Sequence, residues 1–166
     1  LKDGDLVVGA AVAPDGAELV FVASDAQLLR FDAASVRPQG RAAGGMAGVR
    51  LSAGASVVAF NVVTEPADAV VVTIAGSSQA IAGTDAGSAK VSLFEEFPPK
   101  GRATGGVRAQ RFLKGEDVLT LAWVGTEPRG LAADGAVRTL PDAGAKRDAS
   151  GHPLDAVVAA VGAAIA

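Results

Sequence analysis

A glycine-rich heptapeptide occurs twice in this chain. Gly-Arg-Ala-Ala-Gly-Gly-Met occupies residues 40–46, and Gly-Arg-Ala-Thr-Gly-Gly-Val occupies residues 101–107, 61 positions later. Apolar positions after the two heptapeptides also correspond, as in Leu51, which matches Phe112. Such a match over roughly twenty residues indicates an internal repeat, and repeats of this kind bury their core by packing against their neighbours.

Short apolar runs bounded by turn signals recur along the chain, and valine, which favours strands, is frequent in them. Asp15-Gly16 is a hairpin turn signal ahead of the first run. The predicted strands occupy residues 18–23, 27–31, 57–63, 68–74, 88–91, 110–112, 118–124, 129–133, 136–140 and 156–161. This pattern predicts an all-β, propeller-like array of about three four-stranded antiparallel blades. An alternating β/α arrangement is disfavoured, because no stretch before residue 150 keeps helical periodicity.

The repeats organise the chain as one domain. The predicted units are residues 14–63, 68–124 and 128–166. Residues 1–8 resemble residues 113–120, so residues 1–13 are expected to be the tail of a preceding repeat and the chain a fragment of a longer polypeptide. The apolar segment 156–166 is shorter than the roughly 20 residues that a membrane span requires, so no membrane partner is expected.

The residue types that catalyse reactions are sparse in this chain. There is no cysteine, which excludes disulfides and thiolate metal sites. The only histidine, His152, follows the worn third copy of the loop, and a surface turn is its better interpretation. Residues 40–45 have the glycine spacing of a nucleotide-binding P-loop, but Met46 and Ala47 stand where that loop requires Lys and Ser or Thr. We therefore expect no catalytic residue, metal or cofactor in this domain, and Trp123 is expected in the core.

Basic residues gather in two stretches that lack acidic residues. The formal net charge is −3, yet neither residues 36–64 nor residues 97–115 contain Asp or Glu. The candidate DNA contacts from this charge map are Arg37, Arg41, Arg50, Lys100, Arg102, Arg108, Arg111 and Lys114. If the blades stack side by side, the two glycine-rich loops form a basic stripe, where positive charge within a Debye length of about 8 Å attracts phosphates. Glycines beside the arginines would let a nucleic-acid backbone approach closely.

The residues alone leave several interpretations of these loops open. Solvated charges with glycines for tight turns would explain the pattern without any ligand. Binding and bending of a duplex backbone explains it with one. Sequence-specific reading is disfavoured, because neither a recognition helix nor a cluster of base-stacking aromatic residues is visible. The alternative from another functional class is a propeller-like scaffold that binds proteins and not DNA.

The repeats resemble the C-terminal domain of the A subunit of bacterial type IIA topoisomerases, DNA gyrase and topoisomerase IV. The resemblance rests on a strand that ends in a basic residue, a Gly-Arg-x-x-Gly-Gly loop, an apolar-basic strand, a turn with glycine and an acidic residue, and a valine-rich strand. The matching strand segments are Leu29-Arg30-Phe31, Ala89-Lys90-Val91, Val137-Arg138-Thr139, Val49-Arg50-Leu51 and Gln110-Arg111-Phe112. The pattern covers essentially the whole chain.

The resemblance implies a β-pinwheel, in which neighbouring blades exchange strands, and an outer rim that binds duplex DNA non-specifically and wraps it. By position, the residues that match this basic rim are Arg30, Arg41, Lys90, Arg102 and Arg138. The implied partners are duplex DNA, the ATPase B subunit of a heterotetramer, and the rest of the A subunit, in the cytoplasm at the nucleoid. Strand cleavage, and ATP hydrolysis with Mg, are implied elsewhere in the topoisomerase holoenzyme.

The family resemblance does not separate gyrase from topoisomerase IV. The gyrase-defining box Gln-Arg-Arg-Gly-Gly-Lys-Gly is not intact, and its nearest copies are residues 38–45 and 99–106. Either the box lies in an upstream blade, or the chain is topoisomerase IV-like or a divergent relative; gyrase is the preferred interpretation. Whether the worn third loop, which contains Asp142 and Asp148, binds DNA is left open.

Overall fold

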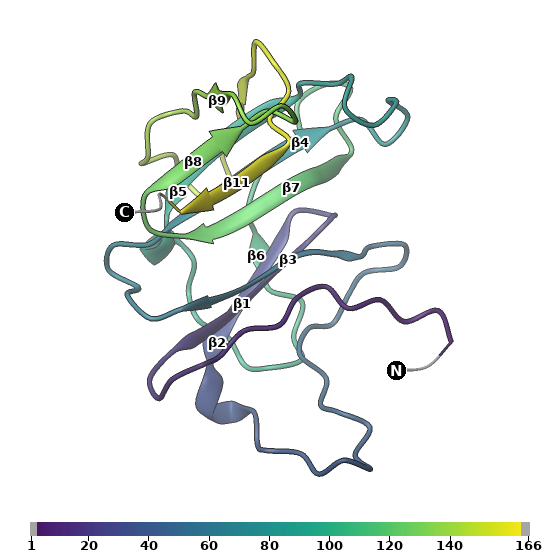
Figure 1. Ribbon diagram of the computed structural model, residues 1–166, viewed down its shortest axis with the longest axis vertical. Helices are drawn as coiled ribbons and strands as arrows, with labels where there is room; N and C mark the ends of the chain where they lie inside the picture. The colour runs from purple at the N-terminus through teal and green to yellow at the C-terminus, as the bar shows by residue number, and fades with distance from the viewer. Residues whose placement is uncertain (1–2, 164–166) are drawn as a thin grey trace.

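The chain folds into strands, turns and loops in the computed structural model, which describes residues 3–163 (Figure 1). The helical turns in that range are two 3-10 turns, η1 (Ala33–Ser35) and η2 (Phe94–Glu96). No helix in the described part is long and apolar enough to cross a membrane. The predicted all-β class is confirmed. Residues 1–2 and 164–166, which belong to the predicted leading tail and third unit, lie outside the described residues.

The first sheet contains four antiparallel strands in the order β3-β1-β2-β6. They are β1 (Glu18–Ala23), β2 (Gln27–Asp32), β3 (Val57–Val63) and β6 (Val107–Arg108). The turn between β1 and β2 is tight, because Ala26, at a φ of +60°, donates its N–H to the Ala23 carbonyl over 3.0 Å. A second turn, at Asp15-Gly16, leads the chain into β1 as its sequence predicts.

The second and third sheets follow along the chain. The second has the order β10-β5-β4-β7, formed by β4 (Val70–Gly76), β5 (Ser88–Leu93), β7 (Val118–Gly125) and β10 (His152–Pro153). The third has the order β11-β8-β9, formed by β8 (Pro128–Leu131), β9 (Val137–Arg138) and β11 (Ala160–Ala163). It therefore has three strands among the described residues, where four were predicted.

Each of the first two sheets is completed by a strand from the following repeat. β6 comes from the second glycine-rich loop and pairs Val107 with Leu28 of β2. β10 comes from the third repeat and pairs His152 with Ala89 of β5. Neighbouring sheets thus exchange strands, as a β-pinwheel requires, and this predicted architecture is confirmed.

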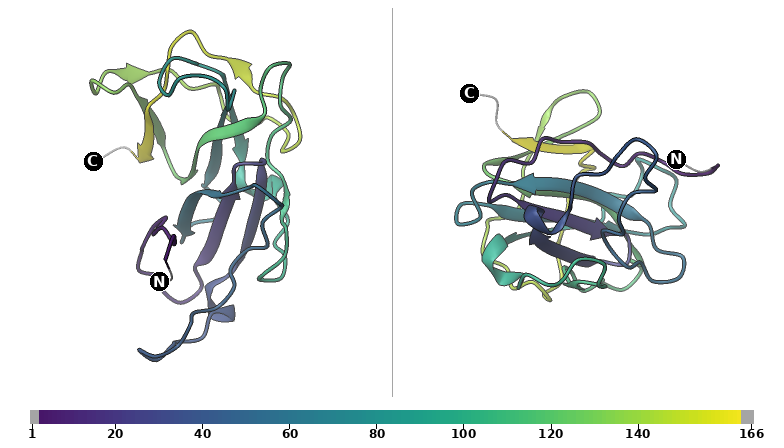
Figure 2. Two further views of the ribbon diagram at one scale, coloured as in Figure 1. Left: turned by 90° about the vertical axis from the view of Figure 1, so that its right-hand side faces the viewer. Right: turned by 90° about the horizontal axis from the view of Figure 1, so that it is seen from below.

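The sheets pack face against face around two interfaces, with the first sheet in the lower half of the molecule and the other two in the upper half (Figures 1 and 2). The interface between the first and second sheets forms the largest core cluster. Its fully buried side chains include Val20, Val22, Leu28, Val71, Phe94, Phe97 and Leu119. Burial of one such side chain contributes roughly 1.5–3 kcal/mol. This interface therefore fixes β6 and the loops that flank it.

The interface between the second and third sheets is smaller. Val72 and Val91 of the second sheet are fully buried there, and Leu140 and Val161 of the third repeat pack against them half-buried. Trp123 packs in the same cluster, as its place in an apolar strand predicts.

The structure differs from the predicted strands at residues 110–112 and 156–161, and it adds the short strands β6 and β10, which were not predicted. Residues 110–112 form no strand, and Arg111 makes only an isolated parallel bridge to Ser150. The strand predicted at residues 156–161 lies at Ala160–Ala163. His152 was predicted in a turn and instead lies exposed in β10. In each case the residues pair with a segment that is distant in sequence. The local pattern of apolar residues therefore cannot predict where the strand forms.

We predict that Gly106→Ala destabilises the chain far more than Gly45→Ala. The two glycines have matched φ values of +80° and +82°, so the strain of an alanine at positive φ, about 1 kcal/mol, is common to both. A Cβ on Gly106 would also lie 2.3 Å from the Leu28 carbonyl oxygen, whereas one on Gly45 would meet nothing within 4 Å. Urea denaturation should show a loss of about 1 kcal/mol for G45A and about 3 kcal/mol or more for G106A. Equal losses of stability in the two variants would contradict a role of Gly106 in the pairing of β6 with β2.

Candidate nucleic-acid interface

Three long loops are joined in series by backbone hydrogen bonds. They are loop 1 (residues 36–56), loop 2 (residues 97–117, which includes β6) and loop 3 (residues 139–151). In the left view of Figure 2, loops 2 and 3 lie on the right-hand side, and β8 and β11 lie on the left-hand side. The two glycine-rich loops are in direct contact, because Ala103 donates its N–H to the Gly48 carbonyl over 2.7 Å.

The same backbone contact joins each loop to the next. The N–H of Arg50 in loop 1 donates to the Thr104 carbonyl of loop 2 over 3.0 Å. The N–H of Arg111 in loop 2 donates to the Ala149 carbonyl of loop 3, also over 3.0 Å. Arg50 and Arg111 are the basic residues of the two matching apolar-basic segments in the sequence. The loops therefore form one continuous surface in which a basic side chain recurs at each junction.

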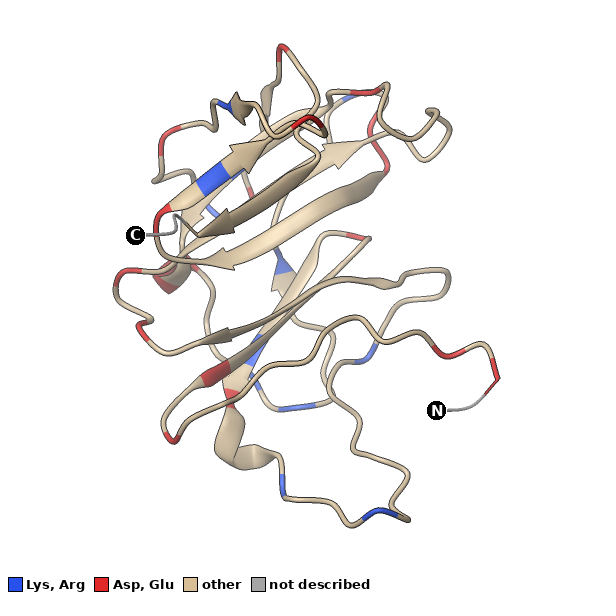
Figure 3. Ribbon diagram, in the orientation of Figure 1, with Lys and Arg blue, Asp and Glu red and all other residues tan. Residues whose placement is uncertain are grey.

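We define the basic belt as six of the cations that loops 1 and 2 carry. The belt consists of Arg41, Arg50, Lys100, Arg102, Arg108 and Arg111. All are exposed except Arg102, which is half-buried. Arg37 and Arg41 are exposed on the part of loop 1 that extends from the body, and Lys114 is exposed beside the Gly115 turn. Figure 3 shows basic segments on these loops, and acidic segments on loop 3 and on other parts of the molecule. Residues 36–64 and 97–115 contain no Asp or Glu.

Two cations of the belt also stabilise the loops. Arg102 donates from Nη1 to the Ala47 carbonyl over 2.5 Å, which ties loop 2 to loop 1. Lys100 donates from Nζ to the Gly106 carbonyl over 3.2 Å, within loop 2. Because these hydrogen bonds use only part of each charged group, the positive charge remains at the surface while its position is restricted.

Arg30, a candidate DNA contact by resemblance, points into the molecule. Its side chain is only 11% exposed and forms an ion pair with Glu18, 3.3 Å from Nη1 to Oε1. Its guanidinium also lies 4.3 Å from the centroid of the Phe94 ring. A cation over an aromatic face gains electrostatic energy from the ring. Arg30 thus joins the first sheet to η2 and is not presented to a ligand.

Lys90 does not occupy the structural position of Arg30. Both β2 and β5 lead into a 3-10 turn, and Arg30 lies three residues before η1 while Lys90 lies four residues before η2. Because neighbouring residues of a strand point to opposite faces, Lys90 corresponds to Leu29 and lies on the other face of its sheet. It is 1% exposed.

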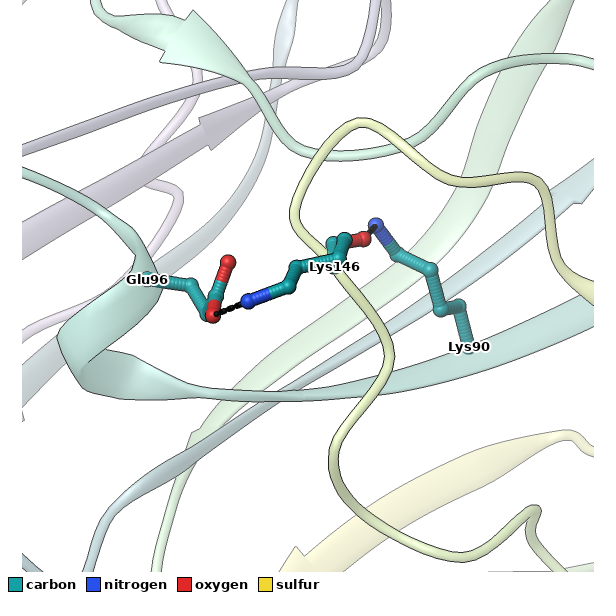
Figure 4. A network of polar contacts seen from close by, with 3 residues as sticks. All are labelled: Lys90, Glu96 and Lys146. Atoms are coloured by element: carbon teal, nitrogen blue, oxygen red, sulfur yellow. Dashed lines mark hydrogen bonds and ion pairs between the residues drawn. The ribbon is translucent and has the colours of Figure 1, made fainter.

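The buried Lys90 ammonium is bound by loop 3 (Figure 4). Its Nζ donates to the Lys146 carbonyl over 3.0 Å and to the Arg147 carbonyl. Burial lowers the pKa of Lys90 to about 8, although the carboxylates of Asp148 and Glu96 act in the opposite direction. Two carbonyl partners reduce the cost of burying a charge, but they do not remove it.

Loop 3 contributes two cations that sequence reasoning did not assign. Lys146 is exposed and donates from Nζ to Glu96 Oε1 over 2.9 Å. This hydrogen bond lowers the pKa of Glu96 and raises that of Lys146. Arg147 is half-buried beside it. The sequence identified this loop as a third copy, but its acidic residues Asp142 and Asp148 left its DNA binding open, so the basic pair was not assigned as a contact.

The last candidate by resemblance, Arg138, is half-buried and donates from Nε to the Val157 carbonyl over 3.4 Å. It lies in the third sheet, away from the contacts that join loops 1 and 2. Within residues 3–163, no group of three or more His, Asp or Glu side chains could hold a metal ion. The charged loops are therefore the most developed candidate site in the described chain.

We predict that Lys90→Met removes a pH dependence of stability. The pKa of Lys90 is about 8 in the folded chain and 10.5 at its ordinary value, so between these pH values the unfolded chain binds more protons. The stability contribution of Lys90 therefore rises as the pH is raised from about 8 to about 10.5. Urea denaturation across this interval should show the parent chain gaining stability relative to K90M. A constant or falling difference would contradict the burial of a charged Lys90.

Comparison with known proteins assigns the family. A sequence profile described as "DNA gyrase C-terminal domain, beta-propeller" matches residues 17–64 and 79–122. Topoisomerase subunit TopoM of Mycolicibacterium smegmatis is 38% identical over 117 residues, which are 70% of this chain and 15% of that protein. The DNA gyrase A protein of Mycobacterium tuberculosis is 33% identical over 109 residues, which are 64% of this chain and 12% of that protein. The chain therefore spans a small part of the length of these relatives.

A solved structure supports the fold. The C-terminal domain of E. coli ParC superposes with a TM-score of 0.71 at 16% identity, over 98% of this chain and 66% of that chain. At this identity the likeness concerns the fold alone. On the strength of the profile match, the chain belongs to the DNA gyrase C-terminal domain family of beta-propellers.

Proposed function

We propose that this chain binds duplex DNA along the basic belt, without reading its sequence, and bends or wraps it. The proposal places the chain as the C-terminal domain of the A subunit of a type IIA topoisomerase. There it would present a DNA segment for strand passage. Family membership and the similarity to DNA gyrase A proteins support this placement.

The observation that carries the proposal is the repeated contact between loops. The N–H of Arg50 donates to the Thr104 carbonyl, and the N–H of Arg111 donates to the Ala149 carbonyl. These two hydrogen bonds place basic side chains at equivalent points of successive loops. Neither residues 36–64 nor residues 97–115 contain a carboxylate to neutralise them. A row of cations at recurring positions can follow a phosphate backbone, and several such contacts release counterions and favour binding.

The surface offers little for reading bases. Sequence-specific proteins commonly place a helix or a β-ribbon in the major groove, and no helix longer than one 3-10 turn occurs within residues 3–163. The three aromatic rings of the first sheet contact one another instead: Phe21 stacks on Phe31 with centroids 5.8 Å apart, and Phe60 lies tilted against Phe21 with centroids 5.1 Å apart. These observations favour binding to the DNA phosphate backbone. Any sequence preference would then come only from how easily the duplex bends.

The remaining parts of the reaction would lie outside this chain. On this proposal the rest of the A subunit cleaves and rejoins DNA, and an ATPase B subunit of the heterotetramer hydrolyses ATP with Mg. Gyrase, with its supercoiling activity, is our preferred holoenzyme over topoisomerase IV, although neither loop holds an intact gyrase box. The proposal includes a cytoplasmic location at the nucleoid.

We predict that Arg41→Ala and Arg50→Ala each weaken duplex binding to a similar degree for unrelated DNA sequences. Removal of one phosphate contact should reduce the slope of log K against log salt by about one. Arg129→Ala is the matched control, because Arg129 is also exposed but lies in β8, on the other side of the molecule from loop 2. Titration of labelled duplex at several salt concentrations measures the slope.

A triple charge reversal, Arg41→Glu, Arg102→Glu and Arg111→Glu, should abolish the shift of a duplex in a native gel. Because Arg102 also binds loop 1, folding of this variant is checked first by circular dichroism. Unchanged affinity in the folded variant would exclude the belt as the DNA site. If the parent chain shows no binding at physiological salt, a protein-binding scaffold would replace the proposal.

A further inference from the structure

The junction between loops 2 and 3 contains a buried cation that the junction between loops 1 and 2 lacks. At the first junction, Arg102 reaches the Ala47 carbonyl from the surface. At the second junction, Lys90 reaches the Lys146 and Arg147 carbonyls from inside the second sheet. The residue that corresponds to Lys90 in the first sheet is Leu29, which is also fully buried but apolar. The charge at this position is therefore particular to the second junction.

A chain of hydrogen bonds links Lys90 to a cation of the belt. The Lys146 carbonyl accepts from Lys90 Nζ and also from the Ala149 N–H, over 3.0 Å in each case, which closes the turn 146–149. The Ala149 carbonyl in turn accepts from the Arg111 N–H. Arg111 also donates from Nε to the Ser150 hydroxyl over 3.3 Å. Both the backbone and the guanidinium of Arg111 are thus set by the turn that Lys90 binds.

Stability alone does not account for a lysine at this place. Taking a charge out of water is costly, and even buried ion pairs can often be replaced by apolar residues of similar volume with no loss of stability or with a gain. The corresponding Leu29 fills its site without a charge. Buried polar groups can instead select one arrangement of the surrounding chain, and Lys90 contacts the two carbonyls that define the course of loop 3.

We propose that Lys90 is a positioning residue of the interface, a buried cation that fixes the turn 146–149 and through it the direction of the Arg111 side chain. Its effect on DNA rests on the proposed function, whereas its effect on loop 3 does not. Loop 3 is then part of the interface although its sequence is worn. DNA itself would contact Arg111 and not Lys90.

The effect on the loop is tested without DNA in the full chain. In Lys90→Met, amide hydrogen exchange at Arg111 should accelerate by about tenfold or more, because its acceptor Ala149 is no longer fixed. Exchange at Arg50, which makes the same contact at the first junction, should stay unchanged. Leu29→Met is the matched control, since it places methionine at the corresponding position, and Lys90→Arg should restore protection. Unchanged exchange at Arg111 in K90M overturns the inference.

The effect on DNA is tested by a double-mutant cycle on duplex affinity. K90M should lower the salt slope by about one, as Arg111→Ala does, and R111A should have no further effect in the K90M background. Arg41→Ala should keep its full effect in both backgrounds. Independent effects of K90M and R111A would show general destabilisation and would contradict a positioning role.

The outcomes separate this inference from the proposed function. If K90M speeds amide hydrogen exchange at Arg111 but the parent chain binds no duplex, the effect of Lys90 on loop 3 would be supported and DNA would be excluded as the ligand. Duplex binding with unchanged exchange would leave the proposed function intact and reject the role of Lys90. Lys90→Gln, which keeps a hydrogen-bond donor without the charge, is the second variant. If neither K90M nor K90Q folds, Lys90 is a folding residue and the inference is rejected.

Discussion

The structure depends on two-residue strands that pair with the sheet of the preceding repeat. Val107 pairs with Leu28, and His152 pairs with Ala89. An unpaired sheet edge exposes backbone N–H and C=O groups, and these short strands pair with two residues of that edge in each of the first and second sheets. Gly106 makes the first pairing possible, because a Cβ there would clash with the Leu28 carbonyl. Neighbouring repeats are therefore joined by backbone hydrogen bonds as well as by the apolar interface between their sheets.

The candidate interface is a consequence of this exchange. To deliver β6 to the first sheet, loop 2 must cross from its own repeat, and this path brings it against loop 1. The contacts of Arg50 with Thr104 and of Arg111 with Ala149 follow from the same crossing in successive repeats. Basic residues that are far apart in sequence thereby become neighbours on one surface. The charge of that surface is local, since the chain as a whole carries a net charge of −3.

Strand-end cations that look equivalent in the sequence have different roles in the structure. Arg30 forms an ion pair with Glu18 and lies over Phe94, Lys90 binds loop 3, and Arg138 donates to the Val157 carbonyl. A shift of one residue relative to the 3-10 turn puts Lys90 on the opposite face from Arg30. Such a shift exchanges the two faces of a strand, and only the observed pairing reveals it. Lys146 and Arg147 were not assigned for a different reason, because the acidic residues of the third loop left its DNA binding open.

The sequence by itself determined the all-β class, the repeats, most of the longer strands and the two basic loops. These properties come from apolar runs, turn residues and charge patterns that act over a few residues, and they are sufficient to recognise the family. The tertiary structure decided which strands are exchanged, where β10 and β11 lie and which cations are exposed. Strands of two residues carry almost no local signal, and their pairing depends on an edge formed by a different repeat. The burial of Arg30 and Lys90 likewise depends on segments that reach them only when the sheets have packed together.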